Sequence, residues 1–325
     1  MRVAVLGCGG MGHVHAQSFA GMADAELVGV CDIDAELAGE LASKTGTRAF
    51  CSFADMLEET DPQVISIALP SYLHKQAVLE AAEAGKHVIC EKPVALSLED
   101  TDEIIEACRR NGVRLFVGHV VRFFPEYEQV RRQIKEGRIG EPGVAHTKRV
   151  GGHPGIARGW FKDHAKSGGV IVDMMIHDID FMRWIWGEVK SVYAMNACKD
   201  DSDYALVTLE FANGAAANLE AHWGDPGPFR YAAEISGSAG LIRLDSAASA
   251  SLHVRTRAQA ERDGRFAEIP QSPGVLSPYD RELAHFLACV RDGAVPLVTA
   301  EDAREALRIA LAALESIQTG KVVLL

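Results

Sequence analysis

The sequence predicts an α/β protein with two parts: an N-terminal doubly wound parallel sheet, then an α+β domain with an open, mostly antiparallel sheet. The first 118 residues alternate short, nearly continuous apolar segments with amphipathic helical segments, which is typical of a parallel sheet covered on both faces. Beyond them, alternating strand patterns replace this order, and Asn213-Gly214 is a strong hairpin signal. We therefore expect two domains, 1–118 and 119–325.

Each expected element follows from its local pattern. Apolar runs predict the strands, and apolar residues recurring every three or four positions predict the helices. The segment 151–167 has no clear period, and loops of that length are often functional. In the first part we expect strands at 2–6, 27–31, 48–50, 64–69, 87–90 and 114–117, with helices that include 73–83 and 98–110. In the second part we expect helices at 125–136, 170–186, 279–291 and 300–319, and strands at 189–198, 205–211, 215–222, 230–236 and 240–244.

A glycine motif joins the first strand to the first helix. Gly7, Gly9 and Gly12 fit G-x-G-x-x-G, with Gly10 and Met11 completing the loop. In a dinucleotide-binding (Rossmann) unit the three glycines permit a tight turn, close approach of the backbone to a pyrophosphate, and close packing of helix on strand. The N-terminus of the helix then offers N–H groups to the phosphates. The motif therefore predicts a dinucleotide site.

Asp32 ends the second apolar run about twenty residues after Gly12, where such units place the carboxylate that binds the adenosine ribose. The alternative role is that of a turn residue capping the next helix, which Asp34 would fill equally well. The same carboxylate repels a 2′-phosphate, and no cation lies between Asp32 and Lys44. We expect NAD rather than NADP, with Arg48 as the residue best placed to reverse that preference.

Composition restricts the partners and the compartment. The 325 residues carry a formal net charge of −12, which argues against nucleic acid or an anionic membrane as partner. Seven cysteines, with no C-x-x-C pair, are typical of free thiols in a reducing compartment. The first apolar run is too short for a signal peptide. We expect a cytoplasmic protein.

Two loops follow strands at the edge where doubly wound sheets bind ligands. Leu69, Pro70 and His74 follow the fourth strand, and Glu91 and Lys92 follow the fifth. Pro93 fixes the direction of the chain after Lys92. A lysine in such a loop is commonly only solvated, but this position lies beside the expected nicotinamide.

Asp173, His177, Asp180 and Trp184 fall on one face of the helix expected at 170–186. Polar groups on an otherwise apolar helix need partners or a cavity. His177 could simply be satisfied in a domain interface with Asp173 as its partner, or the two could bind a metal, although no second group of ligands is evident. We favour an acid–base pair without metal, in which the carboxylate orients the imidazole.

These motifs together resemble the glucose–fructose oxidoreductase / inositol dehydrogenase / MocA family, nearly end to end. The resemblance rests on G-x-G-x-x-G, Glu91-Lys92-Pro93, Gly118-His119-Val120-Val121-Arg122-Phe123, Trp160-Phe161, and the run from Gly168 to Asp180 that reads G-G-x-x-x-D-x-x-x-H-D-x-D.

The resemblance implies a substrate bound between the two domains over the nicotinamide, with Lys92, Asp173 and His177 catalytic. His177 would take the hydroxyl proton as hydride leaves the same carbon, Lys92 would stabilise the charge on the oxygen, and Asp173 would position it. Arg122, His153 and Trp160 are further candidates for the substrate pocket, although Arg122 could equally form a salt bridge. The cofactor-binding set is Gly7, Gly9, Gly10, Met11, Gly12, Asp32, Leu69, Pro70, His74, Glu91 and Lys92.

The leading function is an NAD-dependent oxidation of a secondary alcohol of a cyclitol, sugar or sugar derivative. The alternatives are a redox-neutral enzyme that uses NAD transiently for glycoside cleavage or epimerisation, and a non-catalytic dinucleotide sensor, against which the three catalytic candidates weigh. Arg149 and Arg158 leave an acidic sugar possible. Small apolar residues on both faces of the second sheet predict a homodimer or homotetramer formed through that sheet, as is usual in the family.

Overall fold

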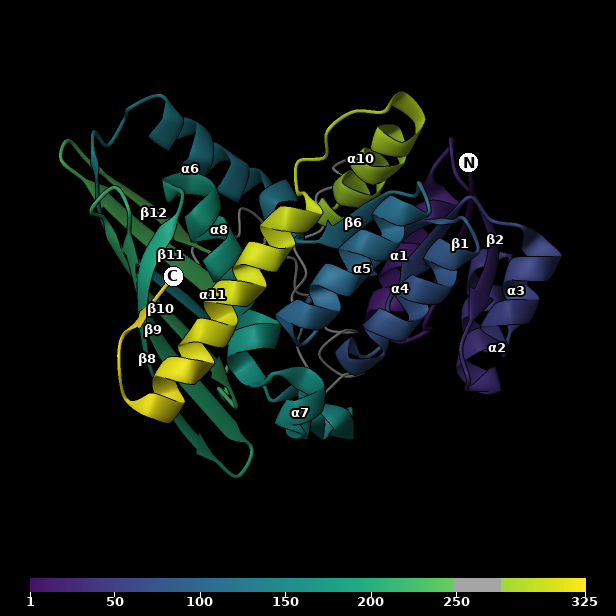
Figure 1. Cartoon of the computed structure of the whole chain (residues 1–325), viewed down its shortest axis with the longest axis horizontal. Coiled ribbons are helices and arrows are strands. Elements are labelled where there is room, and N and C mark those ends of the chain that lie inside the picture. The colour runs from purple at the N-terminus through teal and green to yellow at the C-terminus, as the bar shows by residue number, and fades with distance from the viewer. Residues whose placement is uncertain (248–275) are drawn as a thin grey trace, which may run out of the picture. The chain divides into compact units, whose positions relative to one another are not determined.

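The computed structural model describes residues 1–247 and 276–325, which form two compact units (Figure 1). Neither unit is continuous in sequence. Residues 163–168 and 276–308 belong to the first unit, whereas a division of the chain at residue 118 assigns them to the second domain. The first unit comprises Met1–Tyr127, Asp163–Gly168 and Leu276–Arg308, and the second comprises Glu128–Lys162, the described part of Gly169–Val275, and Ile309–Leu325.

The first unit contains a six-stranded parallel sheet in the order β3-β2-β1-β4-β5-β6. The strand order reverses between β1 and β4, and ligands of doubly wound sheets bind at such a switch point. This confirms the fold class expected for the N-terminal half. The strands are β1 (Arg2–Leu6), β2 (Glu26–Cys31), β3 (Ala49–Phe50), β4 (Val64–Ile67), β5 (His87–Glu91) and β6 (Leu115–Gly118).

Alternate residues of these strands build two apolar cores, one on each face of the sheet. On one face Val3 and Val5 pack with α1, α2 and α10, and on the other Ala4 and Leu6 pack with α3, α4 and α5. Burial on both faces explains the nearly continuous apolar strands. The helices of this unit are α1 (Gly10–Gly21), α2 (Ala35–Thr45), α3 (Phe53–Thr60), α4 (His74–Glu83), α5 (Leu98–Arg110), α7 (His164–Ser167), α10 (Pro278–Asp292) and the first part of α11 (Ala300–Thr319).

Helix α10 is a late segment of the chain that completes the core of the first unit. Phe286 stacks on Phe116 of β6 with ring centroids 4.9 Å apart, and Leu283 is fully buried in the same core. Ser18 of α1 donates a hydrogen bond to Asp280 at 2.5 Å. The helix was expected from its periodicity, but its attachment to the first sheet depends on contacts far apart in sequence.

The second unit contains a seven-stranded sheet in the order β12-β11-β7-β10-β9-β8-β13. Every neighbouring pair is antiparallel except β7 and β10, which run parallel. The expected mostly antiparallel sheet is confirmed. Its strands are β7 (Pro142–Gly151), β8 (Val189–Lys199), β9 (Ser202–Phe211), β10 (Ala216–Trp223), β11 (Arg230–Gly237), β12 (Leu241–Asp245) and β13 (Val323–Leu324).

Strand β7 was not expected from the sequence, although it lies near the middle of this sheet. Its inward face carries Thr147 and Arg149, so the strand lacks the apolar alternation on which prediction depends. The buried Arg149 is compensated by Asp178 of α8 (Ile176–Trp186), at 2.7 and 3.2 Å. The ion pair with Asp178, which is distant in sequence, therefore allows this polar strand to lie in the hydrophobic core of the second unit.

The helix expected at 170–186 is present, but its first part is not α-helical. Residues Ile171–Met175 form a π-helical turn that leads directly into α8. Such turns are rare, contain an extra residue, and frequently lie at functional sites. The other helical segments are α6 (Pro125–Lys135) and the 3-10 turns Ser71–Leu73, Val120–Phe123, Pro154–Ile156 and Gly159–Lys162, the last two within the loop expected at 151–167.

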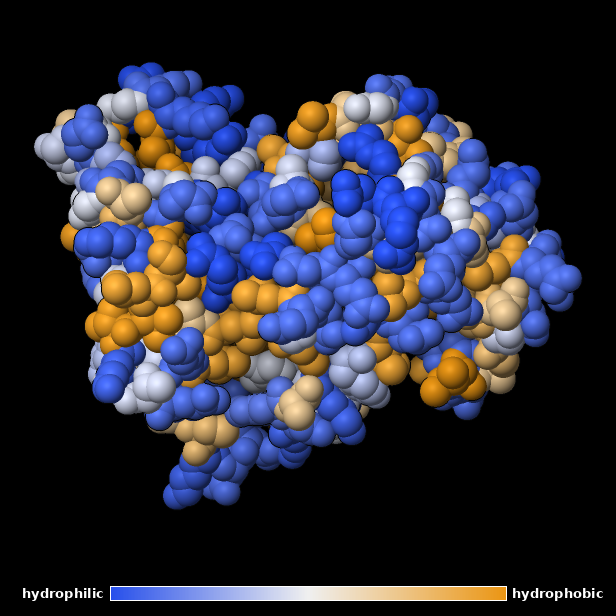
Figure 2. All heavy atoms as spheres, viewed as in Figure 1, coloured by the Kyte–Doolittle hydropathy of each residue, from blue (hydrophilic) through white to orange (hydrophobic). Residues whose placement is uncertain are grey.

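The two faces of the second sheet differ. Ala217 and Leu219 are buried on the side packed by α8, whereas the opposite side carries polar pairs such as Thr208 with Asn218 at 2.8 Å. Small apolar residues therefore do not cover both faces as expected. Figure 2 shows an apolar patch around the C-terminus, where Val322 and Leu324 are exposed. None of the described helices is long and apolar enough to cross a lipid bilayer.

Candidate active site

The glycine loop after β1 has the geometry that its sequence predicts. Gly7 has φ +98°, and a Cβ there would lie 2.6 Å from the carbonyl oxygen of Ala68. A Cβ on Gly12 would lie only 1.8 Å from the carbonyl oxygen of Gly7, so only glycine permits this approach of α1 to β1. Gly9 caps α1 with no side-chain hydrogen bond. The first N–H groups of α1 therefore have no side-chain cap, as a phosphate site requires.

Asp32 lies directly after β2, and backbone N–H groups fix its carboxylate. Oδ2 accepts a hydrogen bond from the N–H of Cys8 at 2.8 Å, and Oδ1 accepts one from Asp34 at 3.0 Å. Burial and the nearby Asp32 raise the pKa of the Cys8 thiol to about 12. The helix cap is a different residue, since Asp34 accepts from the first-turn N–H groups of α2. Asp32 is thus held against the glycine loop.

Arg48, the residue best placed to favour NADP, is engaged elsewhere. Its guanidinium pairs with Glu59 and lies 4.8 Å from the centre of the Phe50 ring. A carboxylate partner reduces the positive charge that a 2′-phosphate would meet.

His74 joins the two loops that follow β4 and β5. Its Nε2 lies 2.9 Å from the carbonyl oxygen of Leu69, and its Nδ1 lies 2.8 Å from that of Pro93. Burial lowers the pKa of His74, outweighing the two carbonyls that raise it. The imidazole thus faces loop backbone on both sides. Pro70 and Lys92, one in each loop, are half-buried.

A buried polar cluster beneath these loops was missed by the sequence reasoning. His15 of α1 contacts Ser66 of β4 at 2.7 Å and Glu91 of β5 at 3.0 Å. The available signal was Ser66, the one polar residue in an otherwise apolar strand.

The side chains of Asp173 and His177 are more exposed than those of their neighbours in the sequence. Both are half-buried, and every other residue from 170 to 182 is buried. The π-helical turn contains Asp173, and α8 begins one residue before His177. Asp180 does not share their surface, since it is fully buried, while Trp184 packs beneath the guanidinium of Arg131 at 4.2 Å. The expected polar face is therefore restricted to Asp173 and His177.

Two expected pocket residues meet in an aromatic cluster of the second unit. Trp160 stacks on Phe161 with centroids 3.8 Å apart, and Phe161 meets the edge of Trp223 at 5.7 Å. His153 lies 5.3 Å from the same Trp223 ring, and its Nδ1 accepts from the N–H of Gly155 at 2.9 Å. The sequence reasoning missed Trp223, which ends β10 and unites this cluster.

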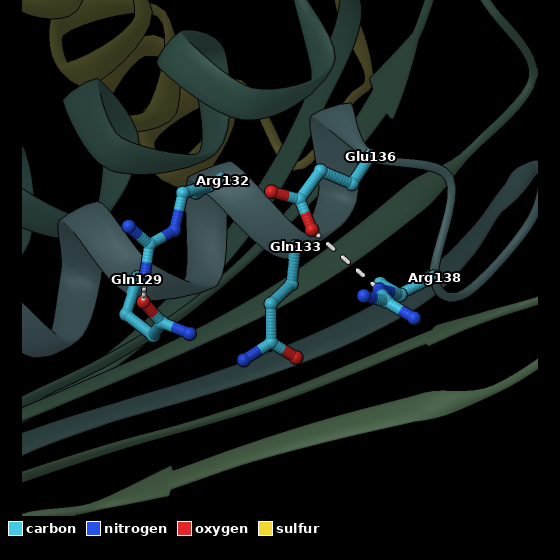
Figure 3. Close-up of a pocket in the computed structure, with 5 residues that line it drawn as sticks. All are labelled: Gln129, Arg132, Gln133, Glu136 and Arg138. Carbon is cyan, nitrogen blue, oxygen red and sulfur yellow. Dashed lines mark hydrogen bonds and ion pairs between the residues drawn. The ribbon is translucent and has the colours of Figure 1, made fainter.

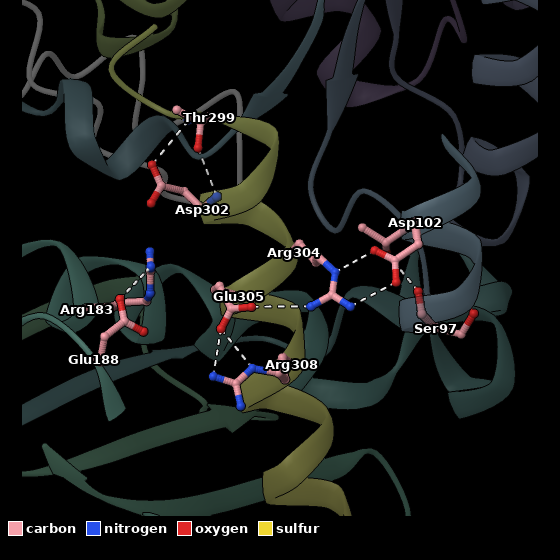
Figure 4. Close-up of polar contacts among 10 residues, drawn as sticks. Ser97, Asp102, Arg183, Glu188, Thr299, Asp302, Arg304, Glu305 and Arg308 are labelled. Atoms are coloured by element: carbon pink, nitrogen blue, oxygen red, sulfur yellow. Dashed lines mark hydrogen bonds and ion pairs between the residues drawn. The ribbon is translucent and has the colours of Figure 1, made fainter. Parts of the chain in front are cut away.

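Arg122 forms the salt bridge that was one of its two alternatives. The buried guanidinium donates to Asp302 at 3.0 Å and to the carbonyl of Leu297 at 2.9 Å, all within the first unit. Figure 4 shows the same end of α11, where Thr299 and Asp302 form its N-terminal cap. One turn further on, Arg304 binds Asp102 of α5 through two nitrogens, at 2.5 and 2.8 Å.

The two arginines that leave an acidic sugar possible differ in environment. Arg149 is buried against Asp178, and its guanidinium lies 5.3 Å from the centre of the Tyr231 ring. Arg158 is exposed in the loop after Pro154–Ile156. A buried carboxylate partner balances the charge of Arg149.

An open polar hollow on α6 lies apart from the expected site residues (Figure 3). Arg132 binds Gln129, and Arg138 lies 3.5 Å from Glu136, so side chains of the hollow itself pair with one another. Gln133 completes its lining, and none of the expected site residues takes part. We assign no function to this hollow.

The glycine loop, Asp32 and the switch point between β1 and β4 define a dinucleotide-binding protein. Residues 1–119 match the profile described as "Oxidoreductase family, NAD-binding Rossmann fold", and residues 131–325 match "Oxidoreductase family, C-terminal alpha/beta domain". The chain belongs to the Gfo/Idh/MocA oxidoreductase family, and its first unit carries the family's NAD-binding fold.

Relatives of known sequence and structure agree with this membership. The chain is 32% identical to a scyllo-inositol 2-dehydrogenase (NAD(+)) of Bacillus subtilis, covering 98% of this chain and 95% of the relative. It is 37% identical to a 2,7-anhydro-N-acetylneuraminate hydratase of Escherichia coli, over 56% of this chain and 51% of the relative. A crystal structure of a myo-inositol dehydrogenase from Corynebacterium glutamicum matches with a TM-score of 0.82 and 27% identity, covering 100% of this chain and 98% of that chain.

Proposed function

We propose that this protein oxidises a secondary alcohol of a cyclitol, sugar or sugar derivative with NAD. The observation that carries the proposal is the exposure pattern of residues 170–182, where Asp173 and His177 alone are not buried. An apolar helix that presents a carboxylate and an imidazole is suited to acid–base work. The inositol dehydrogenases among its relatives support a polyol as substrate.

In this proposal His177 is the general base that removes the hydroxyl proton, and Asp173 positions the reacting oxygen or its neighbours. Lys92 donates a hydrogen bond to the same oxygen and stabilises its developing negative charge. NAD, when bound, accepts the hydride from the carbon that carries this oxygen. We assign further substrate contacts to His153 and Trp160, whereas the buried Arg122 binds Asp302 and the carbonyl of Leu297.

Cofactor binding rests on residues of the first unit. The uncapped N-terminus of α1, reached through Gly9, Gly10 and Met11, suits a pyrophosphate. Asp32 suits the two ribose hydroxyls, because its fixed carboxylate accepts hydrogen bonds. The remaining candidates lie at or next to the carboxyl ends of β4 and β5. They are Leu69 and Pro70 after β4, His74 at the start of α4, Glu91 at the end of β5, and Lys92 after it.

The second candidate is a redox-neutral reaction in which NAD is reduced and reoxidised within one turnover. The similarity to a 2,7-anhydro-N-acetylneuraminate hydratase favours this candidate. A non-catalytic dinucleotide sensor is the third and weakest, because Lys92, Asp173 and His177 are all present.

The deciding experiment incubates the enzyme and NAD with a panel of inositols, aldoses and anhydro sugars. NADH absorbance and product formation are followed together. Accumulation of NADH in proportion to product supports the dehydrogenase, product without NADH supports the redox-neutral enzyme, and the absence of both with intact NAD binding supports the sensor.

We also propose that the protein forms a homodimer or homotetramer through the outer face of the second sheet and acts in the cytoplasm. That face includes Tyr193, Met195 and Val144, which are 41, 51 and 44% exposed. Free cysteines throughout the chain suit a reducing compartment. Light scattering that finds a stable monomer at micromolar concentration would contradict the assembly.

A further inference from the structure

The proposed catalytic mechanism does not use the buried cluster of His15, Ser66 and Glu91. One of its members, Glu91, directly precedes the catalytic candidate Lys92 in the sequence. The relative exposures of His15, Ser66 and Glu91 are 1, 0 and 7%. The cluster connects β4 and β5, which are neighbours in the sheet, with α1, the helix that follows β1 on the other side of β4. Ionisable groups at such depth are costly unless each is paired, so this pairing needs an explanation beyond simple packing.

The hydrogen bonds define the state of each group. An ionised carboxylate only accepts, so Nε2–H of His15 donates to Oε1 of Glu91 at 3.0 Å. In the neutral ring, Nδ1 then accepts from the hydroxyl of Ser66 at 2.7 Å. The second oxygen of Glu91 accepts from the backbone N–H of Lys92 at 3.2 Å. The carboxylate therefore holds both the imidazole and the peptide that begins the Lys92 loop.

Gly118 leaves room for this carboxylate. It pairs with Glu91 across β5 and β6, and a Cβ there would lie 3.2 to 3.4 Å from the carboxylate atoms. Both oxygens of Glu91 have partners within the protein, which fixes the orientation of its carboxylate.

We propose that His15 is a positioning residue for Lys92: its hydrogen bond orients the Glu91 carboxylate, which in turn accepts the backbone N–H of Lys92 and fixes the start of the loop that carries this lysine. The inference rests on the proposed function, in which Lys92 contacts the reacting oxygen of the substrate.

The charges around Glu91 are consistent with this role. Burial alone raises the pKa of Glu91, but the hydrogen bond from His15, with contributions from Lys92 and His74, lowers it overall. Removing His15 therefore removes a main interaction that favours the ionised carboxylate, the group that accepts the N–H of Lys92.

The test uses His15→Met, which removes both ring nitrogens, and His15→Gln, whose amide N–H can still reach Glu91. Glu91→Gln removes the negative charge directly. The control is His87→Asn at the opposite end of β5, where a side-chain oxygen can replace the Nδ1 that accepts from Arg114 at 3.0 Å. Two quantities are measured: kcat with NAD in excess, and the hydrogen-exchange rate of the Lys92 backbone N–H in the cofactor-free protein, followed by ¹⁵N NMR.

We expect His15→Met and Glu91→Gln to speed exchange of the Lys92 N–H about tenfold or more, because its hydrogen bond to the carboxylate is weakened or lost, and to lower kcat about tenfold or more at neutral pH. His15→Gln should retain kcat within about threefold, and His87→Asn should match wild type. Unchanged exchange of the Lys92 N–H in either folded variant overturns the inference, and if His15→Met does not fold, Glu91→Gln decides. If exchange is faster but the wild type oxidises no polyol, the proposed function fails and the coupling of His15 to Lys92 remains.

Discussion

The carboxylate of Asp32 accepts a hydrogen bond from the backbone N–H of Cys8, with 2.8 Å between Oδ2 and the nitrogen. This bond ties the end of β2 to the glycine loop that follows β1. Asp32, which is expected to determine the preference for NAD over NADP, is thus held by the glycine loop, which is expected to bind the pyrophosphate. A change in this hydrogen bond would therefore affect both parts of the cofactor site.

Asp32→Ala should weaken NAD binding about 10- to 100-fold and reduce the preference for NAD over NADP, because hydrogen bonds to a charged group contribute about 1.5–3 kcal/mol. The measurement is kcat/KM with each cofactor. Asp34→Ala is the matched control, since Asp34 caps α2; it should lower stability by about 1 kcal/mol and leave the preference unchanged. A wild-type preference for NADP would refute the assignment.

His177→Ala should lower kcat about 10²–10⁴-fold, the usual contribution of a positioned proton acceptor. Lys92→Ala should also lower kcat, since the charge that it stabilises develops mainly in the transition state. NAD affinity, measured by fluorescence titration, should change little in both. The control is His146→Ala on β7, an exposed histidine on the opposite face of the second sheet from Arg149. Near-normal turnover of His177→Ala would mean that another group is the base.

Gly12→Ala should abolish NAD binding or folding, because the new Cβ would lie 1.8 Å from the carbonyl oxygen of Gly7. Gly39→Ala, in the middle of α2, meets no atom within 4 Å. It should raise the free energy of unfolding by about 0.5–1 kcal/mol, through the helix preference of alanine. Thermal unfolding with and without NAD compares the two variants. Normal NAD binding by Gly12→Ala would show that α1 can move away from β1 without loss of the cofactor site, and would contradict this prediction.

Asp178→Ala should destabilise the protein by about 3–5 kcal/mol, because it leaves the guanidinium of Arg149 buried without its carboxylate. Asp201→Ala breaks the exposed pair with Lys162 and should leave stability almost unchanged, because solvent screens that pair. Urea unfolding measures both. Equal effects would show that Arg149 finds another partner when Asp178 is removed.

The folded protein should lose stability on acidification as Glu91 becomes protonated. The pKa of Glu91 is lower in the folded state than its ordinary value of 4.5, because His15 and Lys92 outweigh burial. The carboxylate therefore contributes stability above about pH 4.5 that is lost as pH falls through the lower, folded value. Glu91→Gln, compared with wild type by urea unfolding between neutral pH and pH 4, should show a weaker dependence on pH. The same pH dependence in both proteins would exclude this contribution.

Much of the first unit could be predicted from the sequence because its determinants are local. The glycine motif, Asp32 and the apolar strands act through neighbouring residues, and their spacing alone defines the parallel sheet and dinucleotide loop. The helices 279–291 and 300–319 were likewise predicted from their periodicity, since α10 and α11 occupy nearly the same residues. The catalytic roles of Lys92, Asp173 and His177 were inferred from motif and remain predictions.

The tertiary structure decided whatever depends on partners far apart in the chain. Strand β7 carries a buried arginine, and only Asp178, 29 residues away, makes that arginine compatible with a core. The π-helical turn before α8 limits the polar face to Asp173 and His177, and helical spacing alone gave no sign of it. His15 was one histidine in a helix until folding placed it against Glu91, 76 residues later. The sequence by itself determined local backbone geometry and apolar pattern, because these act over a few residues. The pairing of buried charges depends on long-range contacts, and only the folded chain brings those groups together.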